Sequence, residues 1–179
     1  RIKSISSKIT LHNIEGLDYS ELFQTKKEIN VVVHTATSYG RKNEKVEQIL
    51  EANTIFPLLL LEAAASAGVD AFINTGTVLD SNLNIYSLSK DQFRQWGKFF
   101  AQHYGIQFFN IRLEQFFGPD EDDSKFITHL IKNCVNNVPE LKLTKGEQKR
   151  DFIYIDDVVY AYLTLLEKIS SAYCDIPSS

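Results

Sequence analysis

The alternation of short apolar strands with longer helical segments constrains the fold of this chain more than any other feature. A β-branched run, Val31 to Val33, leads into small polar residues, which is typical of a buried strand in a parallel sheet. Apolar side chains then recur at helical spacing from about Glu44 to Ala67, and Gly68 is placed to end that helix before a second strand, Ala71 to Asn74. Strand, helix and strand in this order predict a parallel sheet with right-handed crossovers.

The same unit recurs further along the chain. Aromatic residues repeat at helical steps between residues 89 and 104, and residues 106–113 then read as another strand. A last strand, Phe152 to Ile155, runs into a helix that Asp156 or Asp157 can cap. We therefore predict the α/β class, with a doubly wound parallel sheet.

Residues 119–149 break this rhythm. The segment follows Gly118, opens with an acidic run at Asp120 to Asp123, and contains one expected helix near Phe126 to Asn137 before a polar turn at Gly146. We interpret it as a lobe inserted into the sheet domain.

Composition narrows the class of protein. A chain of 179 residues suits one compact domain with a small lobe, and a net charge of -4 gives no general attraction for nucleic acid or anionic membrane. Cys134 and Cys174 have neither metal-ligand spacing nor a disulfide-dense pattern, so we expect no metal. The most apolar run, Ile55 to Ala67, contains Pro57 and Glu62 and is too short to span a bilayer. A soluble cytoplasmic protein is expected.

The strongest local signal is the pair Tyr86 and Lys90. On a helix, a spacing of four residues places both side chains on one face, with Cβ atoms about 5 to 6 Å apart. A tyrosine pKa near 10 is too high for proton transfer at neutral pH, and a neighbouring ammonium lowers it by stabilising the phenolate. The alternative is an ordinary pair on a surface helix, without a catalytic role.

The position of the pair favours catalysis. It follows the strand Ala71 to Asn74, and open α/β sheets place their chemistry at the carboxyl ends of strands. Thr77 lies in the polar turn after that strand, where it can hydrogen-bond a substrate oxygen. Alternatively, Thr75 and Thr77 only satisfy backbone groups of the turn.

An ordered set of motifs supports a resemblance to a known family. These are His34-Thr35-Ala36, Asn53, the turn ending at Thr77, Tyr86-x-x-x-Lys90, Ile111 to Gln115 with Gly118-Pro119, and Arg150 to Tyr154. In this order the chain resembles the extended short-chain dehydrogenases/reductases of the nucleotide-sugar epimerase/dehydratase group. Within that group, residues 73–77 and 113–115 most resemble the 4-ketoreductases of CDP-3,6-dideoxyhexoses of the abequose and paratose type.

The resemblance implies roles at the reacting centre. Tyr86 would be the acid/base on the sugar 4-oxygen, Lys90 would lower its pKa and bind the nicotinamide ribose, and Thr77 would hold the same oxygen. The cofactor would be NAD or NADP. Its contacts would be Tyr86 and Lys90, with Asn13, Ile14, His34, Thr35, Ala36 and Thr75. On the residues alone, Asn13 is equally readable as a turn former and His34 as a satisfied histidine at a strand end.

Substrate contacts also follow from the resemblance. Arg150 would bind the diphosphate of a CDP- or UDP-linked sugar, for which a planar guanidinium is suited. Gln115, Lys125 and Phe126 would line the same subsite, although Gln115 stands where many relatives have Asn. The resemblance further implies a homodimer formed through the helices near residues 50–67 and 89–104.

The residues after Thr77 separate the possible reactions. Family dehydratases carry an Asp-Glu pair there, whereas this chain has Val78 and Leu79, which cannot transfer protons. Reduction of a 4-keto sugar and 4-epimerisation both need only Tyr86, Lys90, Thr77 and a hydride carrier, so both stay open. A non-catalytic nucleotide-binding relative would be expected to lack Tyr86 or Lys90.

Two expectations concern structure rather than chemistry. Pro57 cannot donate to the carbonyl of Asn53, so the helix should open there, either to bind water near the catalytic pair or as a plain packing kink. We expect residues 1–118 and 150–169 to belong to a Rossmann-like cofactor domain whose Gly-rich turn would precede Arg1. Residues 119–149 and 170–179 would belong to the substrate lobe.

Overall fold

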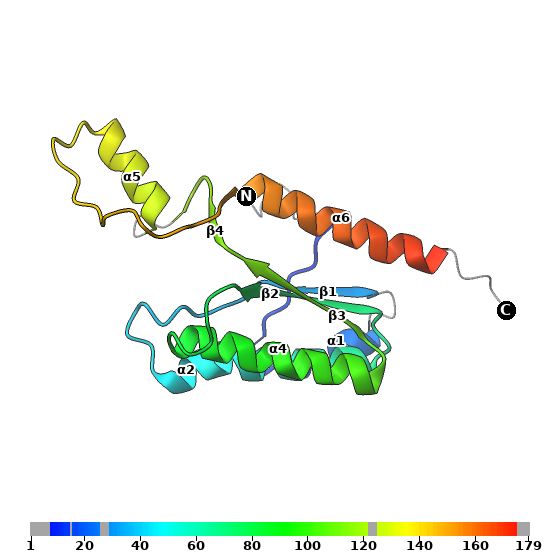
Figure 1. Ribbon diagram of the computed structural model, residues 1–179. Helices are drawn as coiled ribbons and strands as arrows, with labels where there is room; N and C mark the ends of the chain where they lie inside the picture. The colour runs from blue at the N-terminus through cyan, green and yellow to red at the C-terminus, as the bar shows by residue number, and fades with distance from the viewer. Residues whose placement is uncertain (1–7, 15, 26–28, 122–124, 175–179) are drawn as a thin grey trace.

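A sheet of three parallel strands organises the chain. The computed structural model describes residues 8–14, 16–25, 29–121 and 125–174. The strands β1 (Val31–His34), β2 (Ala71–Thr77) and β3 (Gln107–Leu113) lie in the order β1-β2-β3. Figure 1 shows α6 on one side of this sheet and the helices α1 to α4 on the other. The expected α/β architecture with a parallel sheet is therefore observed.

The alternation of side chains along β2 builds a core on each face, because successive residues of a strand point to opposite sides. Phe72 packs with residues of α1 (Tyr19–Thr25), α3 (Phe56–Ser66) and α4 (Ile85–Tyr104). Its neighbours Ala71 and Ile73 pack against α6 (Ile155–Cys174) on the opposite face. Burial of a large side chain such as Phe72 contributes about 1.5 to 3 kcal/mol. The two cores hold the carboxyl end of β2 between the helical layers.

Helix α4 lies close against β3 because it carries a glycine at the contact. A Cβ atom at Gly97 would overlap the ring of Phe108, so no larger residue fits without a shift. Phe93, which is fully buried on the same helix, packs edge to face with Phe72 at 5.8 Å between ring centroids. These contacts fix the position of α4 and of the first turn that carries Tyr86.

The helix that precedes β2 opens where Pro57 predicts. It consists of α2 (Val46–Leu50), a π-helical turn η2 (Glu51–Ile55) and α3. At the end of the turn the N–H of Phe56 donates to the carbonyl of Glu51, five residues back. The predicted opening of this helix is confirmed.

The same helix is longer than the apolar run suggested. Residues Val46–Ser66 are long and apolar enough to cross a membrane by length and composition alone. Leu61 and Ala64, however, are fully buried against the sheet, so this is a core helix of the α/β fold.

A second, smaller sheet extends the molecule. Strands β4 (Gln115–Phe117) and β5 (Phe152–Tyr154) pair in parallel, and α5 (Phe126–Val135) lies beyond them, apart from the main sheet in Figure 1. Neither β4 nor α1 was predicted, since three-residue strands and one short helix leave little periodicity. Helix α6 begins at Ile155, so Asp156 and Asp157 lie in its first turn instead of capping it. Their charges still favour a helix N-terminus.

Candidate active site

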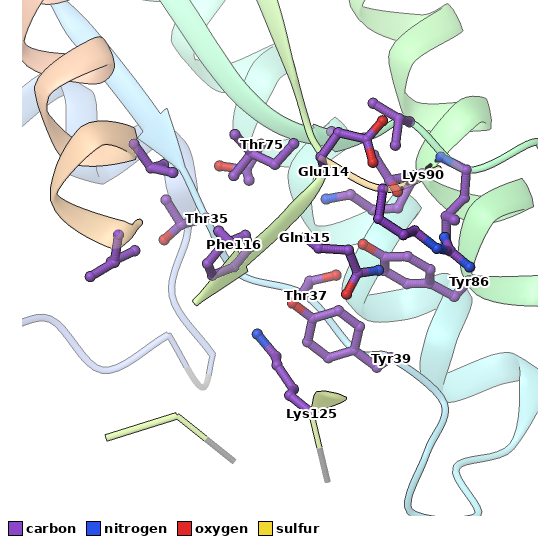
Figure 2. A pocket seen from close by; sticks show the side chains of 18 of the residues that line it. Thr35, Thr37, Tyr39, Thr75, Tyr86, Lys90, Glu114, Gln115, Phe116 and Lys125 are labelled. Atoms are coloured by element: carbon purple, nitrogen blue, oxygen red, sulfur yellow. Dashed lines mark hydrogen bonds between the residues drawn. The ribbon is translucent and has the colours of Figure 1, made fainter. Parts of the chain in front are cut away.

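One cleft lies at the carboxyl ends of the parallel strands. It has a volume of about 820 Å³ and is bordered by the loop after β1, the ends of β2 and β3, the start of α4 and the start of α6. Figure 2 shows side chains from these elements converging on it. The cleft contains the predicted residues Thr35, Thr75, Thr77, Tyr86, Lys90, Gln115, Lys125, Phe126 and Arg150.

The catalytic pair is placed by the cap of α4. The side chain of Asn84 accepts a hydrogen bond from the N–H of Ser87 at 2.9 Å, and the Ser87 hydroxyl is 3.2 Å from the N–H of Asn84. This reciprocal capping starts the helix at Ile85. Tyr86 therefore lies in the first turn and Lys90 one turn later, and both side chains line the cleft.

Thr77 is oriented by the turn that ends β2. The N–H of Leu79 donates to Thr77 Oγ1 at 3.2 Å, and the Thr77 side chain hydrogen-bonds the phenol of Tyr86. Because the Leu79 amide uses one lone pair of the hydroxyl oxygen, the Thr77 O–H can be directed at the phenol oxygen. The hydroxyl and the phenol thus meet at one point of the cleft.

The electrostatics of Tyr86 differ from the prediction. Burial raises the pKa of Tyr86, and the nearby Tyr39 raises it further, while the hydrogen bond from Thr77 and the charge of Arg41 act in the opposite direction. Lys90 is not among the causes, so the predicted lowering of this pKa by Lys90 is wrong for the polypeptide by itself. Desolvation dominates, and Tyr86 is a protonated phenol at neutral pH.

Burial also determines the state of Lys90. The side chain is 3% exposed, and desolvation lowers its pKa to about 8. The ammonium form is thus held at a cost inside the fold, in a position where an anionic or hydroxyl-rich ligand would stabilise it.

Two residues of the loop after β1 were missed by the sequence analysis. The ring of Tyr39 lies 5.1 Å from the ring of Tyr86, and the guanidinium of Arg41 lies 5.1 Å above the Tyr39 ring. Both line the cleft, and Figure 2 shows the two tyrosine rings side by side. The available signal was their place after a parallel strand, an argument that was applied only to the loop after β2.

Asn53 connects that loop to α4. Its side-chain oxygen accepts from Thr37 Oγ1 at 3.0 Å and from the N–H of Ser38 at 2.8 Å. Its side-chain nitrogen donates to the Ser38 carbonyl at 2.8 Å and to Ser89 Oγ at 3.0 Å. The amide is fully buried with all four partners present, so it fixes the loop of Tyr39 against the helical turn between Tyr86 and Lys90.

The predicted cofactor residues divide into two sets. Thr35 and Thr75 line the cleft, and Thr75 Oγ1 shares a hydrogen bond of 2.6 Å with the hydroxyl of Tyr162 on α6, a residue the sequence analysis assigned only to an apolar helix face. Asn13, Ile14, His34 and Ala36 do not line it. Asn13 and Ile14 lie on an exposed segment that precedes α1.

His34 lies in the core and not in the cleft. It is 3% exposed, its Nδ1 hydrogen-bonds Asn74 Oδ1 at 3.1 Å, and rings of Phe56, Phe72 and Phe93 surround it. Its Nε2 has no hydrogen-bond partner within the described ranges. Burial lowers its pKa to about 4, so it is neutral at physiological pH.

The predicted substrate residues lie towards β4 and α5. The ammonium of Lys125 is 2.8 Å from a Glu121 carboxylate oxygen and 4.3 Å above the ring of Phe116. Phe126 stacks on Phe152 with 6.1 Å between centroids. Gln115 and Arg150 are exposed at the cleft border, so cationic and aromatic groups gather at this end.

Comparison with known proteins follows from this geometry. The model of the NAD dependent epimerase/dehydratase family matches residues 2–174. A CDP-abequose synthase of Salmonella typhimurium is 41% identical over 143 residues, which are 76% of this chain and 48% of the relative. A CDP-abequose synthase of Salmonella muenchen is 34% identical over 84% of this chain and 54% of the relative. The chain thus spans about half the length of these curated relatives.

Solved structures share the fold. The UDP-glucuronic acid 4-epimerase of Bacillus cereus, in complex with UDP-glucuronic acid and NAD, superposes with a TM-score of 0.73 at 23% identity. The match covers 93% of this chain and 60% of that one. At this identity the likeness concerns the arrangement of strands and helices.

Proposed function

This chain belongs to the NAD-dependent epimerase/dehydratase family, and we propose that its protein is an oxidoreductase acting at C4 of a nucleotide-activated sugar. The specific reaction we propose is reduction of a CDP-4-keto-3,6-dideoxyhexose of the abequose or paratose type. The observation that carries the proposal is the meeting of the Thr77 hydroxyl with a protonated Tyr86 phenol in the cleft that Lys90 lines.

The chemistry of these groups suits reduction. NAD or NADP, when bound, supplies the hydride that adds to C4. Tyr86 donates its proton to the sugar 4-oxygen, so the carbonyl becomes a hydroxyl and the phenol becomes a phenolate. Thr77 stabilises the phenolate by hydrogen bonding, and Arg41 and the Lys90 ammonium favour the negative charge. A raised Tyr86 pKa is appropriate for an acid that must hold its proton until the carbonyl is in place.

The residues present fit a nicotinamide dinucleotide. Thr35, Thr75 and Lys90 offer hydroxyl and ammonium groups to ribose, and α6 presents an apolar wall at Val158, Val159 and Leu163. Such a mixture of an apolar wall with a few convergent polar groups is typical of cofactor clefts. Asn13, Ile14, His34 and Ala36 stay predictions of cofactor contact, with the adenine end at the first two.

The other end of the cleft suits a nucleoside diphosphate. Arg150 offers a planar guanidinium for bidentate binding of phosphate, and Lys125 adds an ammonium. Phe126 presents an exposed aromatic ring for a base, and Gln115 offers an amide beside it. We therefore propose that the sugar lies between this end and Tyr86.

A second candidate is a 4-epimerase of a UDP-linked sugar, because Thr77, Tyr86 and Lys90 serve hydride removal as well as hydride delivery. Val78 and Leu79 line the cleft beside Thr77 and oppose the family's dehydration reaction, since neither transfers a proton. The third reading, a non-catalytic nucleotide-binding relative, is disfavoured by the retained Tyr86 and Lys90.

The test uses the intact protein with NADPH or NADH. Consumption of reduced cofactor with a CDP-4-keto-3,6-dideoxyhexose supports the reductase. Interconversion of UDP-glucose and UDP-galactose without that consumption supports the epimerase. If neither substrate reacts while nucleotide sugar still binds, the non-catalytic reading replaces both.

We also propose a homodimer, formed through the outer faces of α3 and α4. Large apolar side chains are exposed there at Leu59, Trp96 and Phe99. Sedimentation of the intact protein with Trp96→Glu should show a shift towards monomer, and an unchanged sedimentation coefficient would contradict this interface.

A further inference from the structure

The groups that flank the proposed reacting centre are apolar. Leu79 is tied to Thr77 through its N–H, Val78 lies between them in sequence, and the Tyr39 ring lies against the Tyr86 ring. All three side chains line the cleft. We call Tyr39, Val78 and Leu79 the flanking wall.

The polar groups near this wall are already engaged. The side-chain oxygen of Asn84 caps α4 by accepting from the N–H of Ser87. The Thr77 hydroxyl accepts from the N–H of Leu79 and bonds the Tyr86 phenol. The Arg41 guanidinium lies over the Tyr39 ring. Beside the point where Thr77 and Tyr86 meet, these contacts leave apolar surface as the next neighbour of a bound sugar.

The chemistry of a hexose gives this surface a meaning. With the 4-oxygen at Thr77 and Tyr86, the adjoining parts of the sugar are C3 on one side and C5 with C6 on the other. A hydroxyl at C3 or C6 would lose water against the wall without gaining a partner, whereas a methylene or methyl group would pack well.

From this juxtaposition we propose that the flanking wall selects sugars that lack hydroxyls beside the reacting carbonyl, at C3 and at C6. The inference rests on the proposed function, because it assumes that the 4-oxygen lies between Thr77 and Tyr86. It adds residues that choose the substrate class, and Val78 and Leu79 thereby have a role beyond the absence of dehydration.

The test compares two CDP-linked 4-keto sugars that differ by one hydroxyl. The intact protein should reduce CDP-4-keto-3,6-dideoxyglucose with a kcat/KM about tenfold to a hundredfold above that for CDP-4-keto-6-deoxyglucose, which keeps the 3-hydroxyl. Leu79→Asn and the nearly isosteric Val78→Thr should each narrow this ratio several-fold. Leu83→Asn is the matched control, because Leu83 lies in the same loop, is 61% exposed and is not part of the cleft lining.

The outcomes separate the two proposals. Equal kcat/KM for both sugars, or a ratio that folded Leu79→Asn and Val78→Thr proteins leave intact, overturns the role of the wall and leaves the reductase standing. If neither sugar consumes cofactor, the proposed function itself falls, and the inference falls with it.

Discussion

The two ends of the cleft are built differently. At the β2–α4 end, Ser87, Ser89 and Lys90 are each at most 3% exposed, and hydrogen bonds connect this end to Asn53 and the loop after β1. At the β4–α5 end, α5 has no buried residue, and Phe126 is 47% exposed.

This difference separates two requirements of the proposed reaction. Proton transfer depends on positions fixed within a fraction of an ångström, which a buried and fully paired network provides. Recognition of a nucleotide depends on charge and aromatic surface, which exposed side chains can supply. Substitutions at the buried end should therefore abolish turnover or folding stability, and substitutions at the open end should mainly weaken affinity.

The largest effect is expected for Tyr86→Phe. The phenol oxygen is the proposed proton donor, and loss of a general acid lowers the rate by about 10²- to 10⁴-fold. Substrate affinity should change little, because the ring and its contact with Tyr39 remain. Single-turnover kinetics of the intact protein measure this, with Tyr160→Phe, whose side chain is 72% exposed on α6, as the control. A kcat within a few-fold of wild type would remove Tyr86 from the chemistry.

Asn53→Leu tests whether the buried end depends on its hydrogen-bond network. The change would leave the N–H and carbonyl of Ser38 and the hydroxyl of Ser89 without their partner. Each unsatisfied buried group costs about 1 to 3 kcal/mol, so the free energy of unfolding should fall by about 3 to 4 kcal/mol. Urea denaturation measures it. Asn133→Leu on exposed α5 is the matched control, and an equal loss there would erase the contrast between the two ends.

The sequence predicted the sheet and the centre of the site for a clear physical reason. The β-branched run of β1 and the helical repeats of α3 and α4 carry strong periodicity, and Tyr86 and Lys90 are placed by local helix geometry. Tyr39 and Arg41 were missed because their contact with Tyr86 joins segments 47 and 45 residues apart through Asn53, which no local pattern encodes. The Tyr86 pKa was wrong because burial, which sequence does not give, outweighs the predicted effect of Lys90.

Lys90 gives the buried end a pH dependence. Its pKa falls from 10.5 to about 8 on folding, so the charged form is disfavoured in the folded protein. Below pH 8 both states are protonated and the full cost is present. Between pH 8 and 10.5 the unfolded chain binds the extra proton, so stability rises with pH across that window.

Lys90→Met should remove this behaviour together with turnover. The variant should be more stable than wild type at pH 7 by roughly 3 kcal/mol, at 1.36 kcal/mol per pKa unit, and its stability should stay flat from pH 8 to 10.5. Denaturation curves across that range decide it, with Lys98→Met on the exposed face of α4 as the control. A wild-type protein whose stability does not rise in this window would show that Lys90 keeps an ordinary pKa.

The smallest effect is expected at the open end, for Arg150→Lys. The substitution keeps the positive charge and removes the planar fork, so it isolates bidentate binding of a diphosphate from plain attraction. Because Arg150 is exposed, the folded structure should be unaffected, and the Kd for CDP should rise about tenfold, which corresponds to the loss of one charge-assisted hydrogen bond. Calorimetric titration with CDP measures it, and Lys149→Met beside it should leave the Kd unchanged. Equal Kd values for wild type and Arg150→Lys would mean that the diphosphate is bound elsewhere in the cleft, with Lys125 and Arg41 as the remaining cations that line it.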